Sequence, residues 1–383
     1  MKKVDRREAL RLLASAGATA AFACSPSTES QKTEQELATM TTPDPVQAIV
    51  PLPKGNAPWP TQEPFLFCVH HNDQYPRGNP QFGPDSPLTG RPLGQDFAGK
   101  DGWNMYHGQR VPGFPRHPHR GFETVTVVRT GFVDHTDSLG SIARYGQGDV
   151  QWLTAGDGIN HAEMFPLLNQ DDPNPIDFFQ IWLNLPAANK RVPPHFSMLW
   201  APSLPVIHKK DTKGRETSIT LIAGGYGDAP PPVPPPHSWA STAGSNVTIW
   251  TVRMSQNAHF VIPATPAGVT RALYTVTGDG ISIGDHVIPN RSQVLLRSES
   301  IVSLQNKDTP SELLLLGATP IGEPIAQHGP FVMNTNAELV QTFKDYQRTE
   351  LGGWPWPTDD PVHGPNPERF ARYSDGKVEK PTG

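Results

Sequence analysis

The fold and chemistry of this chain are decided by two short stretches, Phe114-Pro-Arg-His-Pro-His-Arg-Gly-Phe-Glu123 and Thr154-Ala-Gly-Asp-Gly-Ile-Asn-His161-Ala-Glu163. The first places His117 two residues before His119, and the second places His161 two residues before Glu163. Because side chains at i and i+2 of a β-strand point to the same face, each pair can reach one ion. Three imidazoles and one carboxylate suit a divalent first-row transition metal. The alternative is a set of surface or hydrogen-bonded histidines beside a turn.

Composition sets the broad class of the protein. The chain has 383 residues, which is enough for two domains, and a net charge of −5 with no basic cluster beyond its first dozen residues. A nucleic-acid surface would need clustered Lys and Arg, so we expect no nucleic-acid partner. The 43 prolines and 34 glycines predict many turns and few long helices. The two cysteines, Cys24 and Cys68, do not suggest a disulfide framework.

Short β-branched and apolar runs separated by turns are typical of a sandwich or barrel. One set comprises 124–128, 131–135, 144–153 and 177–185, and a second comprises 218–222, 246–253, 271–276, 292–296 and 312–316. The second set has only isolated histidines, His237, His259 and His286, so we expect it to bind no metal. A capping box at Thr335 and Glu338 predicts a helix to about residue 347.

The N-terminus is typical of an export signal. Met1-Lys-Lys-Val-Asp-Arg-Arg7 is basic, and the apolar stretch that follows is too short for a comfortable membrane span. Arg6-Arg7 resembles a twin-arginine signal, and Ala21-Phe-Ala-Cys24 resembles a lipoprotein cleavage box; a plain cleaved signal peptide is the alternative. We therefore expect a periplasmic protein, or one tethered to the cell envelope through a lipid on Cys24.

The signal-like N-terminus, the two sets of strands and the predicted helix together indicate the domain organisation. We expect a signal peptide at 1–24, a flexible linker at 25–62, a metal-binding barrel at 63–205, a second barrel with a helix at 206–350, and an irregular tail at 351–383. The Gly/Pro/Asn-rich segment 72–115 lacks a regular pattern and is interpreted as a lid or rim over the site.

Several motifs resemble the pirin family of the cupin superfamily. They are 117–126, Gly148-Asp-Val-Gln-Trp-Leu-Thr-Ala-Gly156, His161-Ala-Glu-Met164, Gln180-Ile-Trp-Leu-Asn-Leu185 and Gly322-Glu-Pro-Ile-Ala-Gln-His-Gly-Pro-Phe-Val-Met-Asn-Thr335. They occur in the family's order between about residues 63 and 347. The resemblance implies an all-β fold of two tandem cupin barrels, of the double-stranded β-helix or jelly-roll type, with a short C-terminal helix. Such a bicupin can be a monomer.

The resemblance also implies the residues of the site. His117, His119, His161 and Glu163 would hold iron(II), with manganese, cobalt, nickel, copper or zinc as alternatives. Glu123 stands where many other cupins place a glutamate ligand, and we interpret it as a support for the ligands or a partner of Arg116 or Arg120. The remaining candidates are Phe122, Met164 and Trp152, which would line an apolar cavity, although Trp152 suits ordinary core packing equally well.

The activity that the resemblance implies is that of a quercetin 2,3-dioxygenase. Such an enzyme opens the ring of a flavonol or related phenolic with O₂, and Glu163 would act as its general base. The alternative is a non-enzymatic iron-binding regulatory or stress protein that acts through a protein partner. Metal storage is a third hypothesis, but one mononuclear site per chain would store metal inefficiently.

Overall fold

The computed structural model describes residues 43–382. The predictions for the signal peptide at 1–24, for Cys24 and for the first part of the linker lie outside the described residues. Within the described range, no helix combines the length and apolar character that a membrane crossing requires.

The first half of the described chain supplies most of one barrel. Its strands are β2 (Phe65–Tyr75), β3 (Gly113–His119), β4 (Phe122–Thr130), β5 (Phe132–Asp137), β6 (Ile142–Gly146), β7 (Val150–Thr154), β8 (Ile159–Met164), β9 (Asn174–Asn184) and β10 (His195–Leu199). A five-stranded sheet has the order β10-β7-β4-β9-β2. The sheet that contains β6-β5-β8-β3 lies opposite, and the two enclose a buried core.

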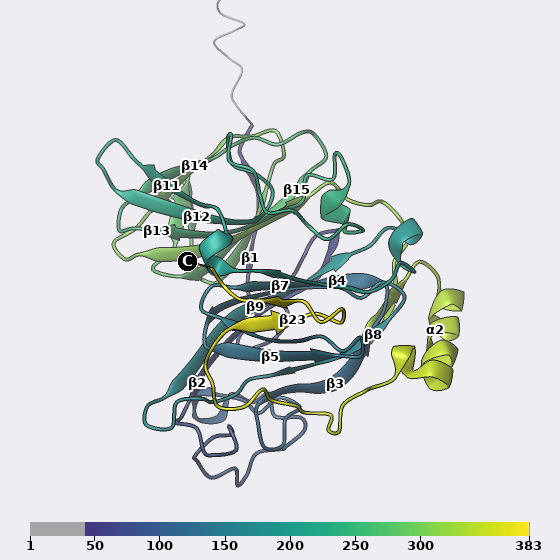
Figure 1. Cartoon of the computed structure of the whole chain (residues 1–383). Coiled ribbons are helices and arrows are strands. Elements are labelled where there is room, and N and C mark those ends of the chain that lie inside the picture. The colour runs from purple at the N-terminus through teal and green to yellow at the C-terminus, as the bar shows by residue number, and fades with distance from the viewer. Residues whose placement is uncertain (1–42, 383) are drawn as a thin grey trace, which may run out of the picture. The chain divides into compact units, whose positions relative to one another are not determined.

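The second half also forms a barrel from one larger and one smaller antiparallel sheet. Its strands are β11 (Val206–Lys210), β12 (Glu216–Ala223), β13 (Thr248–Met254), β14 (His259–Ile262), β15 (Thr270–Thr277), β16 (Ile281–Ile283), β17 (His286–Ile288), β18 (Ser292–Leu296), β19 (Val302–Asn306) and β20 (Ser311–Ala318). The larger sheet contains β18-β15-β20-β13-β12-β11, and the smaller one has the order β14-β19-β16-β17. Figure 1 shows the two sets of strands in blue and green.

Strand alternation explains how the barrels join. On β4, Val125 and Val127 belong to a core that also contains Trp152 and Ile181 from neighbouring strands and Leu314 from β20. These residues face away from the interior of the first barrel, so the two larger sheets pack against each other through a shared apolar layer. The alternate residues of β4 consequently face the interior of the first barrel.

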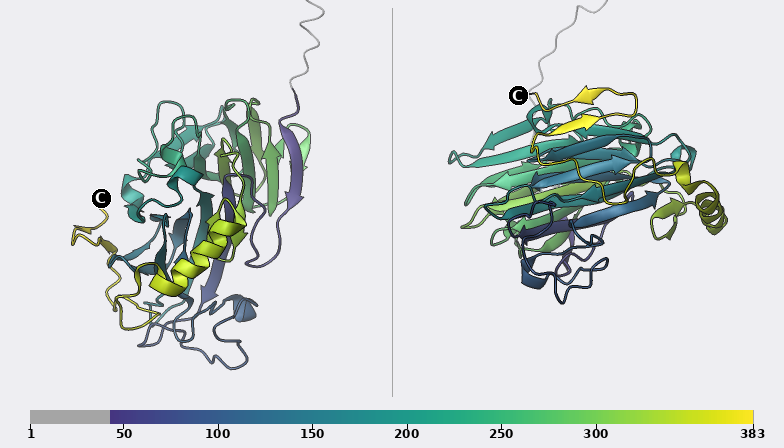
Figure 2. Two further views of the ribbon diagram at one scale, coloured as in Figure 1. Left: turned by 90° about the vertical axis from the view of Figure 1, so that its right-hand side faces the viewer. Right: turned by 60° about the horizontal axis from the view of Figure 1, so that its bottom comes forward.

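Two boundaries predicted from the sequence are wrong. The flexible linker was expected to reach residue 62, but β1 (Val46–Pro51) pairs with β18 at the edge of the second barrel. The tail from residue 351 was expected to be irregular, but β23 (Phe370–Arg372) pairs with β6, and β24 (Val378–Glu379) continues that sheet. Figure 2 shows the tail as yellow strands along the first barrel. Both segments gain backbone hydrogen bonds that an edge strand offers.

A buried arginine fixes the tail in place. Arg144 forms an ion pair with Asp134, with 2.6 Å between Nη2 and Oδ2, and donates from Nη1 to the carbonyl groups of Gly364 and Asn366. Arg144 and Asp134 are both fully buried, so water cannot form hydrogen bonds with the guanidinium group. The tail carbonyl groups accept these hydrogen bonds instead. The tail is therefore an integral part of the first barrel.

The predicted capping box is confirmed. The α-helix of the described part of the chain, α2 (Asn336–Thr349), begins after Thr335, whose side chain accepts from the backbone of Glu338 while Glu338 accepts from the backbone of Thr335. The hairpin of β21 (Ala326–His328) and β22 (Phe331–Met333) packs against it. Short 3₁₀ turns are η1 (Lys100–Gly102), η2 (Ala187–Asn189), η3 (Ala201–Ser203), η4 (Trp239–Ser241) and η5 (Glu350–Gly352).

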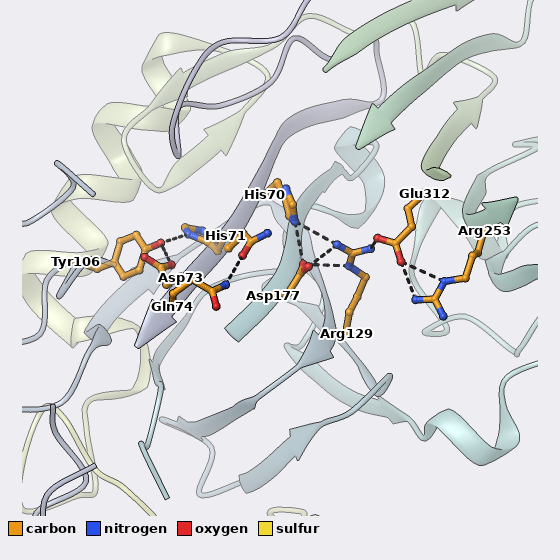
Figure 3. Close-up of polar contacts among 10 residues, drawn as sticks. His70, His71, Asp73, Gln74, Tyr106, Arg129, Asp177, Arg253 and Glu312 are labelled. Carbon is orange, nitrogen blue, oxygen red and sulfur yellow. Dashed lines mark hydrogen bonds and ion pairs between the residues drawn. The ribbon is translucent and has the colours of Figure 1, made fainter. Parts of the chain in front are cut away.

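A chain of ion pairs crosses between the two barrels (Figure 3). Arg129 of β4 contacts Asp177 of β9 at 2.5 Å and Glu312 of β20 at 2.5 Å. His70 extends the chain from Asp177, and Arg253 extends it from Glu312. Burial would raise the pKa of Asp177 and of Glu312, but hydrogen bonds and the charge of Arg129 outweigh it and lower both. The ionised carboxylates are therefore favoured by the folded state.

We expect Arg129→Met to reduce the free energy of unfolding at neutral pH by about 2 kcal/mol, because it leaves two partly buried carboxylates without their cation. Depressed carboxyl pKa values stabilise the fold above the unfolded-state pKa, and this contribution is lost as pH falls through the folded-state pKa. The difference from wild type should therefore shrink in urea titrations at about pH 3. Arg253→Met, at a mostly exposed arginine, is the matched control and should cost less than about 1 kcal/mol. An equal loss in both variants would contradict the assignment.

Candidate metal centre

The three predicted histidines meet inside the first barrel. β3 and β8 are antiparallel neighbours, and His117 lies directly opposite His161. The ring centroids are 4.4 Å apart for His117 and His161, 4.8 Å for His117 and His119, and 4.9 Å for His119 and His161. One nitrogen from each ring lies within 4.8 Å of the other two. The i, i+2 spacing on two paired strands thus produces the expected cluster.

The hydrogen bonding of the cluster fits a metal ion. Nδ1 of His117 contacts the carbonyl oxygen of Pro115 at 2.9 Å, which orients the ring and leaves Nε2 for another partner. Both ring nitrogens of His161 and Nδ1 of His119 are buried without a hydrogen-bond partner in the protein. Burial lowers the pKa of His117 to about 4 and holds the pKa values of His119 and His161 well below the usual 6.5. Neutral imidazoles with free lone pairs are what a transition metal binds.

Glu163 lies beside the histidine cluster and is held from the opposite sheet. Its Oε2 is 3.9 Å from Nε2 of His161 and accepts a hydrogen bond from Nε2 of Gln180 at 2.8 Å. Its Oε1 lies 3.3 Å from Oγ1 of Thr126. Burial raises the pKa of Glu163, and the charge of His135 and these hydrogen bonds oppose that rise. The carboxylate is therefore adjacent to the three histidines, while the compact nitrogen cluster itself consists of His117, His119 and His161.

Several polar residues around Glu163 were not predicted from the sequence. Thr126 of β4 lies opposite Gln180 of β9 on one side and Gln151 of β7 on the other, so all three face the barrel interior. The amide nitrogen and oxygen of Gln151 and Oγ1 of Thr124 are buried without a protein partner. These groups offer hydrogen bonds to a bound polar molecule. A polar residue at alternate positions of an otherwise apolar strand was the available signal.

His135 is a further histidine that sequence reasoning left aside. It lies opposite Glu163 across β5 and β8, and its ring centroid is 5.6 Å from that of His161. Nε2 of His135 contacts Oδ2 of Asp137 at 3.1 Å, and its ring stacks on Phe196 at 4.8 Å. This residue therefore borders the histidine cluster on the side away from β3.

Aromatic side chains form the wall near His119. The ring centroid of Phe122 is 5.0 Å from His119 and 4.4 Å from Trp182. The predicted role of Phe122 beside the site thus agrees with its position. Trp152, by contrast, packs in the core between the barrels, and Met164 lies on the opposite face of β8 from Glu163. Neither lines the metal centre.

Glu123 also faces away from the metal centre. It alternates with Phe122 and Thr124 on β4, and its carboxylate accepts hydrogen bonds from Oγ1 of Thr154 at 2.7 Å and Oγ of Ser238 at 2.6 Å. Burial raises its pKa to about 7. The predicted pairing with an arginine is wrong, because Arg116 bonds Glu350 and Arg120 bonds Asp345. Strand alternation, which places Glu123 at the layer between the barrels, is the physical reason.

A cleft of about 610 Å³ leads to His117. Its lining consists of His107, Gln109, Arg110, Pro115, Arg116, His117, Asp359 and Asp360. The cleft is therefore bordered by the loop that precedes β3, by β3 itself and by the C-terminal tail. Backbone and side-chain bonds join these borders, since the amide of Arg116 donates to the carbonyl of Asp359 at 2.7 Å. His117 is therefore the member of the histidine cluster that borders this cleft.

Comparison with known proteins identifies the family. Residues 93–183 match the Pirin domain, and residues 249–352 match the Pirin C-terminal cupin domain. Rat pirin is 34% identical over 265 residues, which cover 65% of this chain and 81% of that protein. This chain belongs to the pirin family. The predicted fold class of two tandem cupin barrels with a short C-terminal helix is confirmed.

Other pirin relatives carry enzymatic names. A Pseudomonas aeruginosa protein provisionally named as a quercetin 2,3-dioxygenase is 34% identical over 241 residues, covering 62% of this chain and 79% of that protein. The crystal structure of a quercetin 2,3-dioxygenase from Acinetobacter baumannii superposes with a TM-score of 0.63 at 25% identity, covering 81% of this chain and 98% of that one. These likenesses support an oxygenase family for the pirin described here.

Proposed function

We propose that this pirin is a metal-dependent dioxygenase of the quercetin 2,3-dioxygenase type, with a flavonol or related phenolic and O₂ as substrates. The observation that carries the proposal is the cluster of three imidazoles, of which His119 and His161 are buried with unpartnered nitrogens, beside the hydrogen-bonded carboxylate of Glu163. We propose iron(II) as the ion, held by His117, His119 and His161, with Glu163 as the fourth ligand. The names of the relatives from Pseudomonas and Acinetobacter support this reaction class.

The protein residues around the site have defined tasks in this reaction. A divalent metal ion, when bound, would supply a Lewis acid that favours ionisation of a phenolic hydroxyl. Glu163 receives the hydroxyl proton at Oε1, which has only the 3.3 Å contact with Thr126, while Gln180 holds Oε2 at 2.8 Å. The carboxyl group thus keeps its orientation while its protonation state changes.

The walls of the site suit a flat aromatic substrate with hydroxyl groups. Phe122 and Trp182 provide apolar ring faces beside His119 on which an aromatic ring can stack. On the same sheet, Thr124 lies directly opposite Trp182, and Thr124 and Gln151 have free hydrogen-bonding groups for substrate hydroxyls. The apolar wall keeps water away from the reacting ring. In the overall reaction both atoms of O₂ enter the ring-opened product, one ring carbon leaves with its oxygen as carbon monoxide, and the proton on Glu163 returns to the product.

The proposal is tested by metal content and flavonol turnover on one anaerobically purified sample. We expect about one transition-metal ion per chain, and loss of quercetin absorbance matched by equimolar carbon monoxide when oxygen is admitted. Metal without turnover would contradict the dioxygenase and favour an iron-binding protein that acts through a protein partner. Failure to bind metal even after reconstitution would contradict the metal centre itself.

A further inference from the structure

The second barrel has a pocket of its own beside the strand pair that corresponds to β3 and β8 of the first barrel. β14 pairs with β19 as β3 pairs with β8, and each pair lies at the same position in its sheet. The inward side chains of this second pair are apolar: Phe260 and Ile262 on β14, and Val302 and Leu304 on β19. They carry no metal-binding atoms, so the chemistry of this end of the second barrel must differ from that of the first.

A pocket of about 300 Å³ opens at this end of the second barrel. Trp250, Ile262, Val269 and Leu315 supply apolar walls, and Arg271 is the charged residue of the lining. Arg271 lies directly opposite Gly317 across β15 and β20. Because Gly317 has no side chain, the space beside the aliphatic stem of Arg271 stays open. The pocket therefore combines one cation with an apolar surround, which is typical of a small-molecule site.

The charge of Arg271 is not neutralised by the protein around it. The residue is only 2% exposed, and its Nη atoms donate to the backbone carbonyls of Pro263 at 2.8 Å, Ser300 at 2.8 Å and Arg297. Its Nε has no hydrogen-bond partner in the protein. Within residues 43–382 no carboxylate forms an ion pair with it, and burial lowers its pKa to about 10.

An unpaired buried cation is costly, and proteins normally pair such a group with an anion. The three carbonyl groups hold the guanidinium in place but contribute only partial charges. We propose that this pocket binds a small organic monoanion, a carboxylate carried on an apolar or aromatic body, with the carboxylate on Arg271. A single cation matches one negative charge, and the apolar walls match the body better than they match a free inorganic anion. The site is independent of the dioxygenase proposed for the first barrel.

The test uses 4-fluorobenzoate as the probe, observed by ¹⁹F NMR with the full-length holoprotein. We expect saturable binding of 4-fluorobenzoate, and much weaker binding of the neutral 4-fluorobenzyl alcohol. Arg271→Met should weaken the binding at least about tenfold, because a charge-assisted hydrogen bond is lost. Arg253→Met removes a mostly exposed arginine of the same barrel and should leave binding unchanged.

Two further variants keep the test decisive. Thr248→Phe fills the pocket while retaining Arg271, and it should also abolish binding, so the proposal does not depend on the folding of one variant. His161→Ala should bind the probe as wild type does, because the pocket lies in the other barrel. Binding that disappears with His161→Ala would place the carboxylate on the metal centre and overturn the proposal. Binding that survives both Arg271→Met and Thr248→Phe, or no binding to wild type, would overturn it as well.

Discussion

Replacement of His161 by alanine is expected to abolish metal binding. The His161 ring is fully buried, lies directly opposite His117, and is within 5 Å of the ring of His119. Neither of its ring nitrogens has a protein partner, so metal coordination is the interaction for which the ring is free. Loss of a group that merely orients a ligand reduces affinity about 10- to 100-fold, and loss of a ligand should cost at least about 100-fold. Elemental analysis after exhaustive dialysis should find almost no metal in this variant.

His259→Ala is the matched control for this prediction. His259 is also a strand histidine, but it lies on β14 of the second barrel, is exposed, and contacts Oγ of Ser303 at 2.6 Å. It should retain the wild-type metal content. Circular dichroism of both variants would show whether the fold is intact. A folded His161→Ala protein that still carries one metal ion per chain would contradict the centre assigned to His117, His119 and His161.

The cluster of three histidines could be predicted from the sequence because it depends on local spacing. His117 and His119 share a face of β3 for the reason that makes any i and i+2 residues share a face. The residues around the ligands depend on the register between strands that are distant in the sequence. Gln180 reaches Glu163 only because β9 and β8 lie in opposite sheets of one barrel. No local pattern contains that information, so the role of Gln180 could not be predicted from the sequence.

The errors at the chain ends have a related cause. β1 and β23 are short, and neither shows a strong alternating pattern. Each is a strand because the edge of an existing sheet, at β18 or at β6, offers unpaired backbone groups. Such pairing is decided by the tertiary fold and not by the propensity of the segment itself. The position of Glu123, in contrast, could have been predicted from local sequence. Side chains alternate along β4, so Glu123 points to the opposite face from Phe122 and away from the three histidines.

Glu163→Gln is expected to reduce flavonol turnover at least about 100-fold while metal stays bound, since a positioned general base contributes about 10² to 10⁴ in rate. Glutamine has nearly the same shape, and its side-chain oxygen can still accept a hydrogen bond from Gln180 or Thr126. It cannot take up the proton of a substrate hydroxyl. The three histidines, each at its place on β3 or β8, remain available to hold the ion. Steady-state carbon monoxide release, normalised to metal content, measures the effect.

Glu123→Gln is the control that separates proton transfer from the general cost of removing a buried carboxylate. Glu123 is as deeply buried as Glu163, and burial raises the pKa of both. Its hydrogen bonds, however, run to Thr154 and Ser238 in the layer between the barrels. Because its pKa is about 7, a neutral amide resembles the protonated form already populated near neutral pH, and turnover should stay close to wild type. Equal losses in the two variants would show that the effect is structural, and Glu163 would then have no role as the base.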